Sequence, residues 1–106
     1  MDTKHLSANE KEILLRAARQ SLESKIRGEE HPPLAVPELE SPRLQADGAC
    51  FVTLTQNGEL RGCIGSIEAS RPLIEDVREH AIDAALSDPR FPPVHTAELD
   101  ELQIEI

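Results

Sequence analysis

The sequence contains neither tryptophan nor tyrosine and only two phenylalanines, Phe51 and Phe91, so its core must be largely aliphatic. It also lacks any apolar run approaching the roughly 18 residues that a membrane-spanning helix requires. The first residues, 1–5, lead into a polar amphipathic stretch rather than the apolar centre of a signal peptide. These absences predict a cytoplasmic protein that does not span a membrane.

Positive charge is in short supply. Eleven lysines and arginines face twenty aspartates and glutamates, which gives a formal net charge of −9. Nucleic-acid binding draws much of its affinity from a basic surface that neutralises phosphates. A chain that repels polyanions overall is therefore not expected to bind nucleic acid.

Cysteine is scarce as well, and the two that occur, Cys50 and Cys63, stand apart from each other without a CxxC or HxxxH pair. The four histidines are scattered along the chain. These spacings predict free thiols in a reducing compartment, with no disulfide framework and no zinc site. The sequence also lacks GxGxxG, P-loop, GxSxG and HExxH motifs, so no cofactor is expected.

The length of 106 residues suits one domain and is too short for two independent cores. Leu, Ile, Val and Phe make up about a quarter of the chain. That share exceeds the roughly 20% below which a strongly charged chain is expected to be disordered. The chain is therefore predicted to fold around a modest core.

The N-terminal region carries the pattern of an amphipathic helix. Ser7 and Glu10 have the spacing of a capping box, in which each side chain bonds the other residue's backbone N–H. Apolar residues then recur at helical spacing as far as Ile26, and Gly28 supplies a stop. The pattern predicts a helix over residues 8–27.

Residues 29–47 follow with four prolines. Proline lacks a ladder donor and disfavours helix, so this segment is predicted to be an extended connector within one domain. Leu34, Val36 and Leu39 are its candidate anchors, or a short edge strand.

Two strand-like runs, residues 49–55 and 60–67, flank the pair Asn57-Gly58. An Asn-Gly pair here is typical of a two-residue type I′ turn, because both residues must adopt positive φ. A hairpin closed by that turn places Cys63 opposite Val52. Strand alternation then puts both on one face.

In the same register Leu54 faces Arg61 and Cys50 faces Gly65, all on that face. Arg61 and Cys63 are two residues apart on one strand, roughly 6–7 Å between Cα atoms. A one-residue slip would reassign the faces.

A second helix is predicted to begin at a Ser70 cap with Pro72 in its first turn, and to end near residues 87–89. Its apolar stripe recurs at helical spacing and comprises Leu73, Ile74, Val77, Ala81, Ala84 and Ala85. Residues 96–101 suit a single helical turn. Residues 102–106 alternate as a strand, and the chain ends inside it.

These elements predict an α+β fold: a mainly antiparallel sheet with a central β-hairpin, flanked by helices. Because a natural domain rarely stops inside a strand, residues 1–106 are expected to be a single domain that is incomplete.

The chemistry is expected around the second hairpin strand. Gly62 and Gly65 weaken a strand, so two glycines this close call for a bulge or the close approach of a ligand or backbone. Cys63 lies between them, and a nearby Arg61 guanidinium favours its thiolate. The alternative is a small core residue, which free cysteine most often is, and on spacing alone that alternative is favoured about two to one.

The loop Asp88–Pro93 is the second candidate. Its prolines hold Arg90 rigidly, either for an anion or, with equal weight, paired to an acidic side chain. His80 and Asp83 lie one helical turn apart and could form a general-base pair. This role is not favoured, because nothing in the sequence fixes the position of the pair relative to Cys63. The other carboxylates of that helix are assigned to a solvated face: Glu75, Asp76 and Glu79.

The string Leu60-Arg61-Gly62-Cys63-Ile64-Gly65 resembles the signature of the AMMECR domain family. Further segments resemble the family in the same order: residues 48–54, 76–79, 88–93 and 99–106. The resemblance covers nearly the whole chain but only the N-terminal half, or somewhat more, of a family domain. The later TFLPQVW-type segment of the family is missing.

The resemblance implies an intracellular α+β protein of unestablished activity, with the LRGCIG segment as its functional site. Carried over, the site residues are Arg61, Gly62, Cys63 and Gly65, with Arg90 as a weaker addition. Microbial members stand beside, or are fused to, Memo-type and radical-SAM proteins, which implies a shared modification pathway and those proteins as partners. With this resemblance, a functional role and a purely structural role for Cys63 carry equal weight.

Two functions follow. In the first, Cys63 is the nucleophile or acceptor of a multi-protein modification system, and Arg61 stabilises its thiolate or binds an anionic substrate. In the second, the chain is a non-catalytic interaction module in which Cys63 is structural. Its hairpin, the Arg90 loop or the last strand would then dock a partner. The oligomeric state is open.

Overall fold

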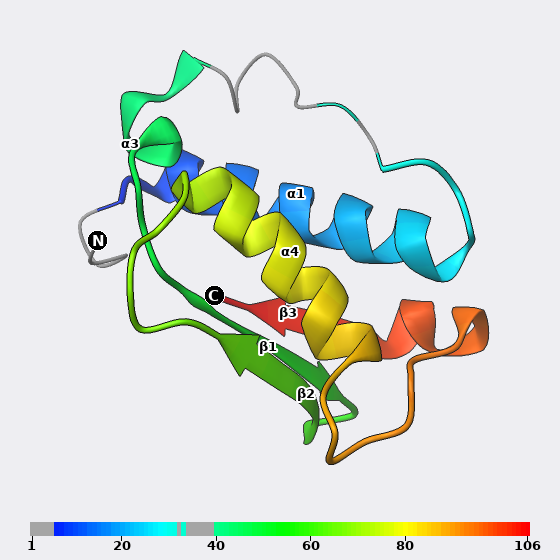
Figure 1. Ribbon diagram of the computed structural model, residues 1–106. Helices are drawn as coiled ribbons and strands as arrows, with labels where there is room; N and C mark the ends of the chain where they lie inside the picture. Colours follow the sequence, from blue (N-terminus) through cyan, green and yellow to red (C-terminus); the bar gives the residue numbers. More distant parts are fainter. Residues whose placement is uncertain (1–5, 32, 34–39) are drawn as a thin grey trace.

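The computed structural model describes residues 6–31, 33 and 40–106. Two long helices lie on one face of a three-stranded antiparallel sheet, whose strand order is β2-β1-β3 (Figure 1). Helix α4 packs on β1 and β2, and α1 packs on α4 and β3. This arrangement confirms the α+β fold with an antiparallel sheet. The elements run in this order: α1 (Ala8–Ile26), α3 (Pro42–Gln45), β1 (Phe51–Gln56), β2 (Glu59–Gly65), α4 (Leu73–Leu86), the 3₁₀ helix η2 (Thr96–Glu101) and β3 (Leu102–Glu105).

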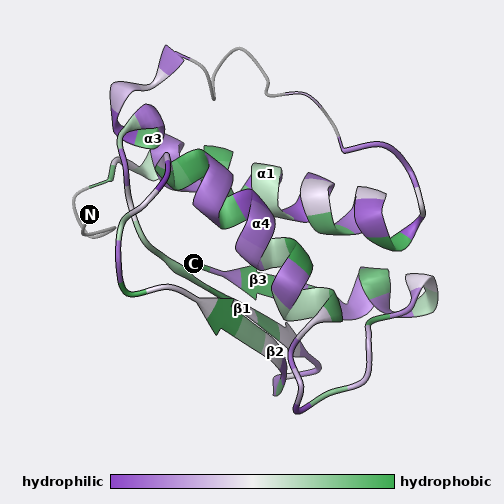
Figure 2. Ribbon diagram, viewed as in Figure 1, coloured by the Kyte–Doolittle hydropathy of each residue, from purple (hydrophilic) through white to green (hydrophobic). Residues whose placement is uncertain are grey.

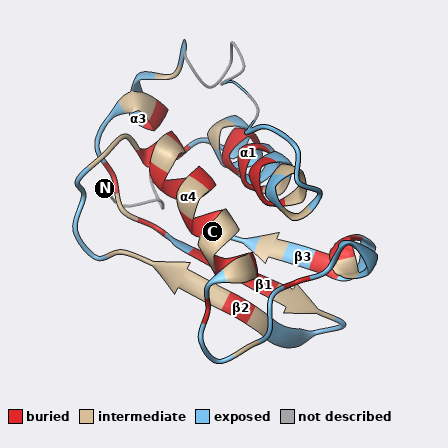
Figure 3. Cartoon of the chain, turned by 45° about the vertical axis from the view of Figure 1, so that its right-hand side comes forward, coloured by how far each residue is buried: buried red, intermediate tan, exposed pale blue. Residues whose placement is uncertain are grey.

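Helix α1 confirms the predicted capping box. The Ser7 hydroxyl accepts from the Glu10 N–H at 3.1 Å, and the Glu10 carboxylate accepts from the Ser7 N–H at 2.9 Å. The helix ends one residue earlier than predicted, and Gly28 beyond it has a φ of +73°. Its buried apolar stripe faces α4 and the sheet (Figures 2 and 3).

The connector contains a short helix that its prolines did not predict. Helix α3 starts with Pro42 in its first turn, where the missing N–H of proline is not needed. The Ser41 hydroxyl caps the helix by accepting from the Leu44 N–H at 3.4 Å, and Leu44 is fully buried. The predicted anchors at positions 34, 36 and 39 lie outside the described residues.

The hairpin turn is confirmed, because Asn57 and Gly58 have φ values of 53° and 82°. The predicted register holds only beside the turn, where Thr55 pairs with Leu60. Further along, the register shifts by one residue, and Arg61 is the extra residue of a β-bulge.

This bulge corrects the predicted faces of the hairpin. Cys63 pairs with Thr53 rather than Val52, and Leu54 pairs with Gly62 rather than Arg61. Val52 and Leu54 are fully buried under α4. Because neighbouring residues of a strand point to opposite faces, Cys63 lies on the sheet face away from the helices.

Helix α4 begins without the predicted Ser70 cap. Pro72 occupies the N-cap position with no side-chain hydrogen bond, and the Leu73 N–H donates instead to the Ala46 carbonyl at 2.9 Å. The predicted apolar stripe is buried along the whole helix. The helical turn over 96–101 and the strand that follows it are confirmed, and β3 pairs antiparallel with β1. Within the described part of the chain, no helix has the length and apolar character needed to cross a membrane.

Candidate functional site

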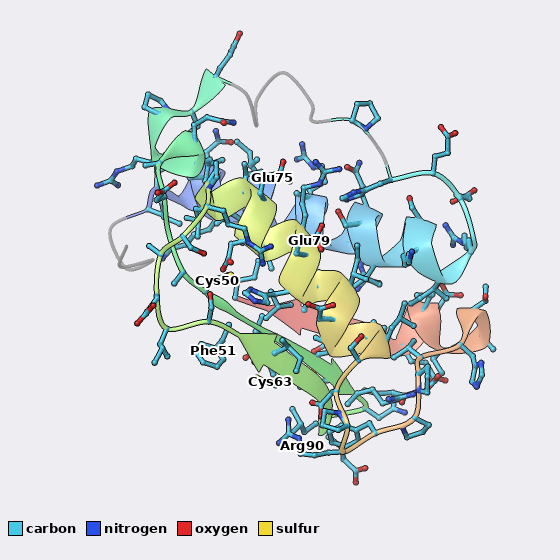
Figure 4. All side chains as sticks on the ribbon, viewed as in Figure 1. Cys50, Phe51, Cys63, Glu75, Glu79 and Arg90 are labelled. Atoms are coloured by element: carbon cyan, nitrogen blue, oxygen red, sulfur yellow. The ribbon has the colours of Figure 1, made fainter. Side chains whose placement is uncertain are left out.

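Cys63 is half-buried in β2, at the edge of the sheet. Its Sγ lies 3.3 Å from the Thr53 hydroxyl on the neighbouring strand. Its backbone N–H donates to Asp88 Oδ2 at 3.0 Å, which ties the sheet edge to the loop after α4. The sulfur thus contacts β1, while the Cys63 backbone contacts the loop; Figure 4 labels Cys63 on β2 and Arg90 on that loop.

Asp88 holds Arg90 in place. The Arg90 guanidinium donates from Nε to Oδ1 at 3.0 Å and from Nη2 to Oδ2 at 2.7 Å, and the Arg90 backbone N–H adds a bond to Oδ1 at 3.0 Å. These hydrogen bonds hold the pKa of Asp88 well below its usual range. The Arg90 side chain stays 56% exposed and lies over the Phe91 ring, 5.4 Å from its centroid.

Arg90 shares Oδ2 of Asp88 with the backbone N–H of Cys63. The hydrogen bond and charge of Asp88 raise the pKa of Arg90, and the charge of Cys63 raises it further.

Arg61, the expected partner of Cys63, is used elsewhere. Its guanidinium donates to the Glu98 carboxylate at 2.9 and 3.2 Å and to the Pro92 carbonyl at 2.8 Å. The hydrogen bonds from Arg61 hold the pKa of Glu98 below its usual value. Arg61 therefore links β2 to the loop after α4 and to η2.

Packing explains both glycines of the motif. A Cβ at Gly62 would overlap the Ala84 carbonyl of α4, and one at Gly65 would overlap the Cys50 carbonyl and Phe51. The glycines admit neighbouring backbone, so no ligand is needed to account for them. Of the candidate residues, Cys63 and Arg90 come together, and Arg61, Gly62 and Gly65 serve the packing around them.

A second cluster was missed in the sequence. Asp76, assigned to a solvated face, is 2% exposed and accepts from the Cys50 Sγ at 3.2 Å. His80 Nδ1 lies 3.1 Å from the same carboxylate oxygen and 4.0 Å from the Cys50 Sγ. The described contacts of His80 thus lead to Asp76 rather than to Asp83. The i, i+4 spacing of Asp76 and His80 was the available signal.

Burial and the neighbouring carboxylate raise the pKa of the Cys50 thiol, so this cysteine is a protonated donor. Burial acts to raise the pKa of Asp76, but hydrogen bonds from Cys50 and Arg71 outweigh it and lower that pKa. Cys50 is therefore not the nucleophile of a Cys–His–Asp arrangement. Its thiol, the carboxylate and the imidazole are nevertheless the three side-chain types that bind transition metals.

Comparison with known proteins places these residues in a family. The model of the AMMECR1 family matches residues 15–106. A protein of Methanothermobacter thermautotrophicus is 42% identical over 101 residues, which cover 95% of this chain and 52% of that protein. Protein MK0488 of Methanopyrus kandleri is 43% identical over 108 residues, covering 95% and 49%.

The fold also matches a solved structure. The crystal structure of the uncharacterized protein PH0010 from Pyrococcus horikoshii superposes with a TM-score of 0.84 at 35% identity, covering 93% of this chain and 50% of that one. The chain thus spans about half the length of the relatives that it matches.

Proposed function

The chain belongs to the AMMECR1 family, and from that premise we propose that it acts through the thiol of Cys63. In this proposal Cys63 is the nucleophile or acceptor in a modification system shared with Memo-type and radical-SAM proteins inside the cell. One observation carries the proposal. Cys63 is the motif side chain that lies on the helix-free sheet face, and its backbone is joined through Asp88 to Arg90, while Arg61, Gly62 and Gly65 are accounted for by packing.

Arg90 takes the role that the spacing had suggested for Arg61. Asp88 fixes the guanidinium through two hydrogen bonds, yet more than half of the Arg90 side chain remains exposed. A fixed and accessible guanidinium is suited to hold an anionic group of a substrate beside the sulfur. Thr53 supplies a hydroxyl that can donate to the thiolate.

The covalent step is a displacement at an electrophilic carbon. The Cys63 sulfur forms a bond to that carbon, and the leaving group departs with the electron pair of the bond that breaks. The thiol proton passes to solvent before the attack, because the thiolate is the nucleophile. In this proposal the partner delivers an electrophile that already carries a good leaving group.

Apolar side chains beside the motif support delivery by another protein. Phe51 is 51% exposed, and Ile67, two residues after Gly65, is 88% exposed. Contiguous exposed apolar patches mark protein-binding surfaces, and Phe51 and Ile67 are the side chains that such a surface would use here. The partners implied by the family resemblance, of Memo and radical-SAM type, are the candidates for that surface.

The second candidate function is an interaction module without chemistry. Within the described residues β3 is an edge strand, and an apolar groove of about 480 Å³ lies between it and α1, lined by Leu6, Leu14, Ile104 and Ile106 among others. A strand of a partner protein could add to this edge and fill the groove. In that function Cys63 serves only to pack beside Thr53.

Timed alkylation of the folded protein, read by mass spectrometry, tests the first function. The expected result is rapid labelling of Cys63, whereas Cys50 is buried and reacts only after denaturation. Arg90→Ala should slow the labelling of Cys63, and Arg90→Lys should slow it less. Arg16→Ala on the exposed side of α1 is the matched control and should leave the rate unchanged. A Cys63 that reacts only after denaturation overturns the proposal and favours the interaction module.

A further inference from the structure

The cluster of Cys50, Asp76 and His80 has no part in the proposed thiol chemistry. Cys50 immediately precedes β1, and Asp76 and His80 lie one turn apart on α4. All three are buried, and one ligand atom from each lies within 4.8 Å of the others. The sheet and the helix thus bring a sulfur, a carboxylate oxygen and an imidazole nitrogen to one point.

Two of the three distances between these atoms are close to those in a tetrahedral metal site. With Zn–S near 2.3 Å and Zn–N and Zn–O near 2.0 Å, tetrahedral ligand atoms are separated by roughly 3.3–3.5 Å. In the structure the carboxylate oxygen lies 3.2 Å from the sulfur and 3.1 Å from the imidazole nitrogen, and the sulfur lies 4.0 Å from that nitrogen. A closure of about half an ångström between Cys50 and His80 would centre an ion among the three.

We propose that Cys50, Asp76 and His80 form a binding site for a divalent transition metal of the zinc class. The donor set decides the class, because thiolate and imidazole suit zinc, whereas magnesium and calcium require oxygen ligands. This site revises the expectation of no zinc site, which rested on spacings along the chain alone. Its role is to link the start of β1 to α4.

The surroundings of Asp76 support the carboxylate as a ligand. Its Oδ1 accepts from Arg71 Nε at 2.9 Å, and the Ser66 hydroxyl lies 3.4 Å from both carboxylate oxygens. Metal-binding carboxylates are commonly oriented by such outer hydrogen bonds. Arg71 thereby holds one oxygen, while the other faces Cys50 and His80. Ser66 or a water is available for the fourth position.

Metal binding exchanges one proton for the ion. The Cys50 thiol loses its proton to solvent, and the neutral imidazole of His80 binds through Nδ1 while it carries its proton on Nε2. One thiolate and one carboxylate then balance the two charges of the ion, and Arg71 remains as the outer cation. Without the ion, the thiol and the imidazole are held by hydrogen bonds to Asp76.

Titration of the reduced, tag-free chain with Co²⁺ tests the site, because cobalt reports thiolate and tetrahedral ligation in its spectrum. The expected result is a thiolate-to-cobalt charge-transfer band with visible d–d bands that saturate at one equivalent and disappear when Zn²⁺ is added. Since the chain has only two cysteines, a band that persists in Cys63→Ser must arise from Cys50. This variant leaves the buried cluster untouched, so it does not depend on the tolerance of the core to substitution.

His80→Gln and Cys50→Ala should each weaken the metal affinity by more than the 10–100-fold that loss of an outer partner typically costs. Circular dichroism before titration confirms that each variant is folded. The proposal is wrong if the wild-type chain shows no thiolate band, if the band is lost in Cys63→Ser, or if folded His80→Gln binds cobalt with unchanged affinity. None of these results bears on the alkylation of Cys63, so the two proposals fail independently.

Discussion

The backbone N–H of Cys63 donates to the Asp88 carboxylate at 3.0 Å, and this bond joins the edge strand of the sheet to the loop that carries Arg90. The carboxylate serves both sides at once, because its oxygens also receive the Arg90 guanidinium. The position of the arginine relative to the sulfur therefore depends on Asp88. The contribution of the Asp88–Arg90 ion pair can therefore be measured by replacing Asp88.

Asp88→Asn should destabilise the protein at neutral pH and lose that effect in acid. Asparagine can still accept from Cys63 but forms no ion pair with Arg90. Because the pKa of Asp88 is lower in the folded protein than the unfolded value near 3.9, its contribution is fully present above that value and is lost as pH falls through the folded pKa. Melting temperatures of both proteins between pH 7 and pH 2 would show the difference shrinking below about pH 4.

Other carboxylates, including Glu98, titrate equally in the wild-type protein and in Asp88→Asn, so they cancel in the comparison. A difference that stays constant from neutral pH into acid would contradict the role of the ion pair.

Gly62→Ala should lower the free energy of unfolding by about 3 kcal/mol, at the upper end of the range for overpacked cores. The added methyl group meets the carbonyl of Ala84, a backbone atom that cannot rotate away. Gly58→Ala is the control, since space is open there and only the positive φ is strained, at about 1–2 kcal/mol. Urea denaturation measures both losses. A Gly62→Ala protein as stable as wild type would show that the glycine serves a ligand instead.

Arg61→Ala should cost stability without affecting the sulfur. Loss of its bonds to Glu98 and Pro92 is expected to lower the free energy of unfolding by about 2 kcal/mol. In a double-mutant cycle with Glu98→Ala, the coupling energy should be about 1–2 kcal/mol. The alkylation rate of native Cys63 should remain that of wild type. A slower rate at unchanged stability would restore Arg61 to the role expected from its spacing.

The hairpin shows how far the sequence predicts this fold. The Asn57-Gly58 turn follows from local backbone preference, and the two strands beside it follow from composition. The bulge at Arg61 does not follow from local sequence. It accompanies the packing of Gly62 against α4 and the hydrogen bond from Arg61 to Glu98, and both of these partners lie far from the hairpin in the sequence. A single extra residue was enough to move Cys63 to the other face of the sheet.

The buried cluster of Cys50, Asp76 and His80 shows the same limit of prediction from sequence. The apolar stripe of α4 was predicted from helical spacing, but Asp76 lies beside that stripe and its burial depends on Cys50, Arg71 and His80 arriving from other positions. Periodicity treats a carboxylate as a surface residue. His80 lies on the same helix, but the Cys50 donors reach the carboxylate only in the tertiary fold, and they help to make its burial favourable.

Thr53→Val tests the hydroxyl that lies within hydrogen-bond distance of the Cys63 sulfur. The Thr53 hydroxyl is 3.3 Å from Cys63 Sγ, and valine keeps the shape of threonine while it removes that hydroxyl. If the hydroxyl donates to the thiolate, its loss removes a hydrogen bond worth about 0.5–1.5 kcal/mol and should slow alkylation of Cys63 by roughly 2- to 10-fold. The rate is measured at fixed pH by mass spectrometry of the labelled peptide.

Thr55→Val is the matched control, because Thr55 lies on the same face of β1 but pairs with Leu60 beside the turn. In the Thr55→Val variant, Cys63 should be alkylated at the wild-type rate. The sign of the Thr53→Val effect decides which atom is the donor. A slower rate means that the hydroxyl stabilises the thiolate, as nucleophilic chemistry at Cys63 requires. A faster rate means that the thiol donates to Thr53 and is held in its unreactive form, which favours the interaction module.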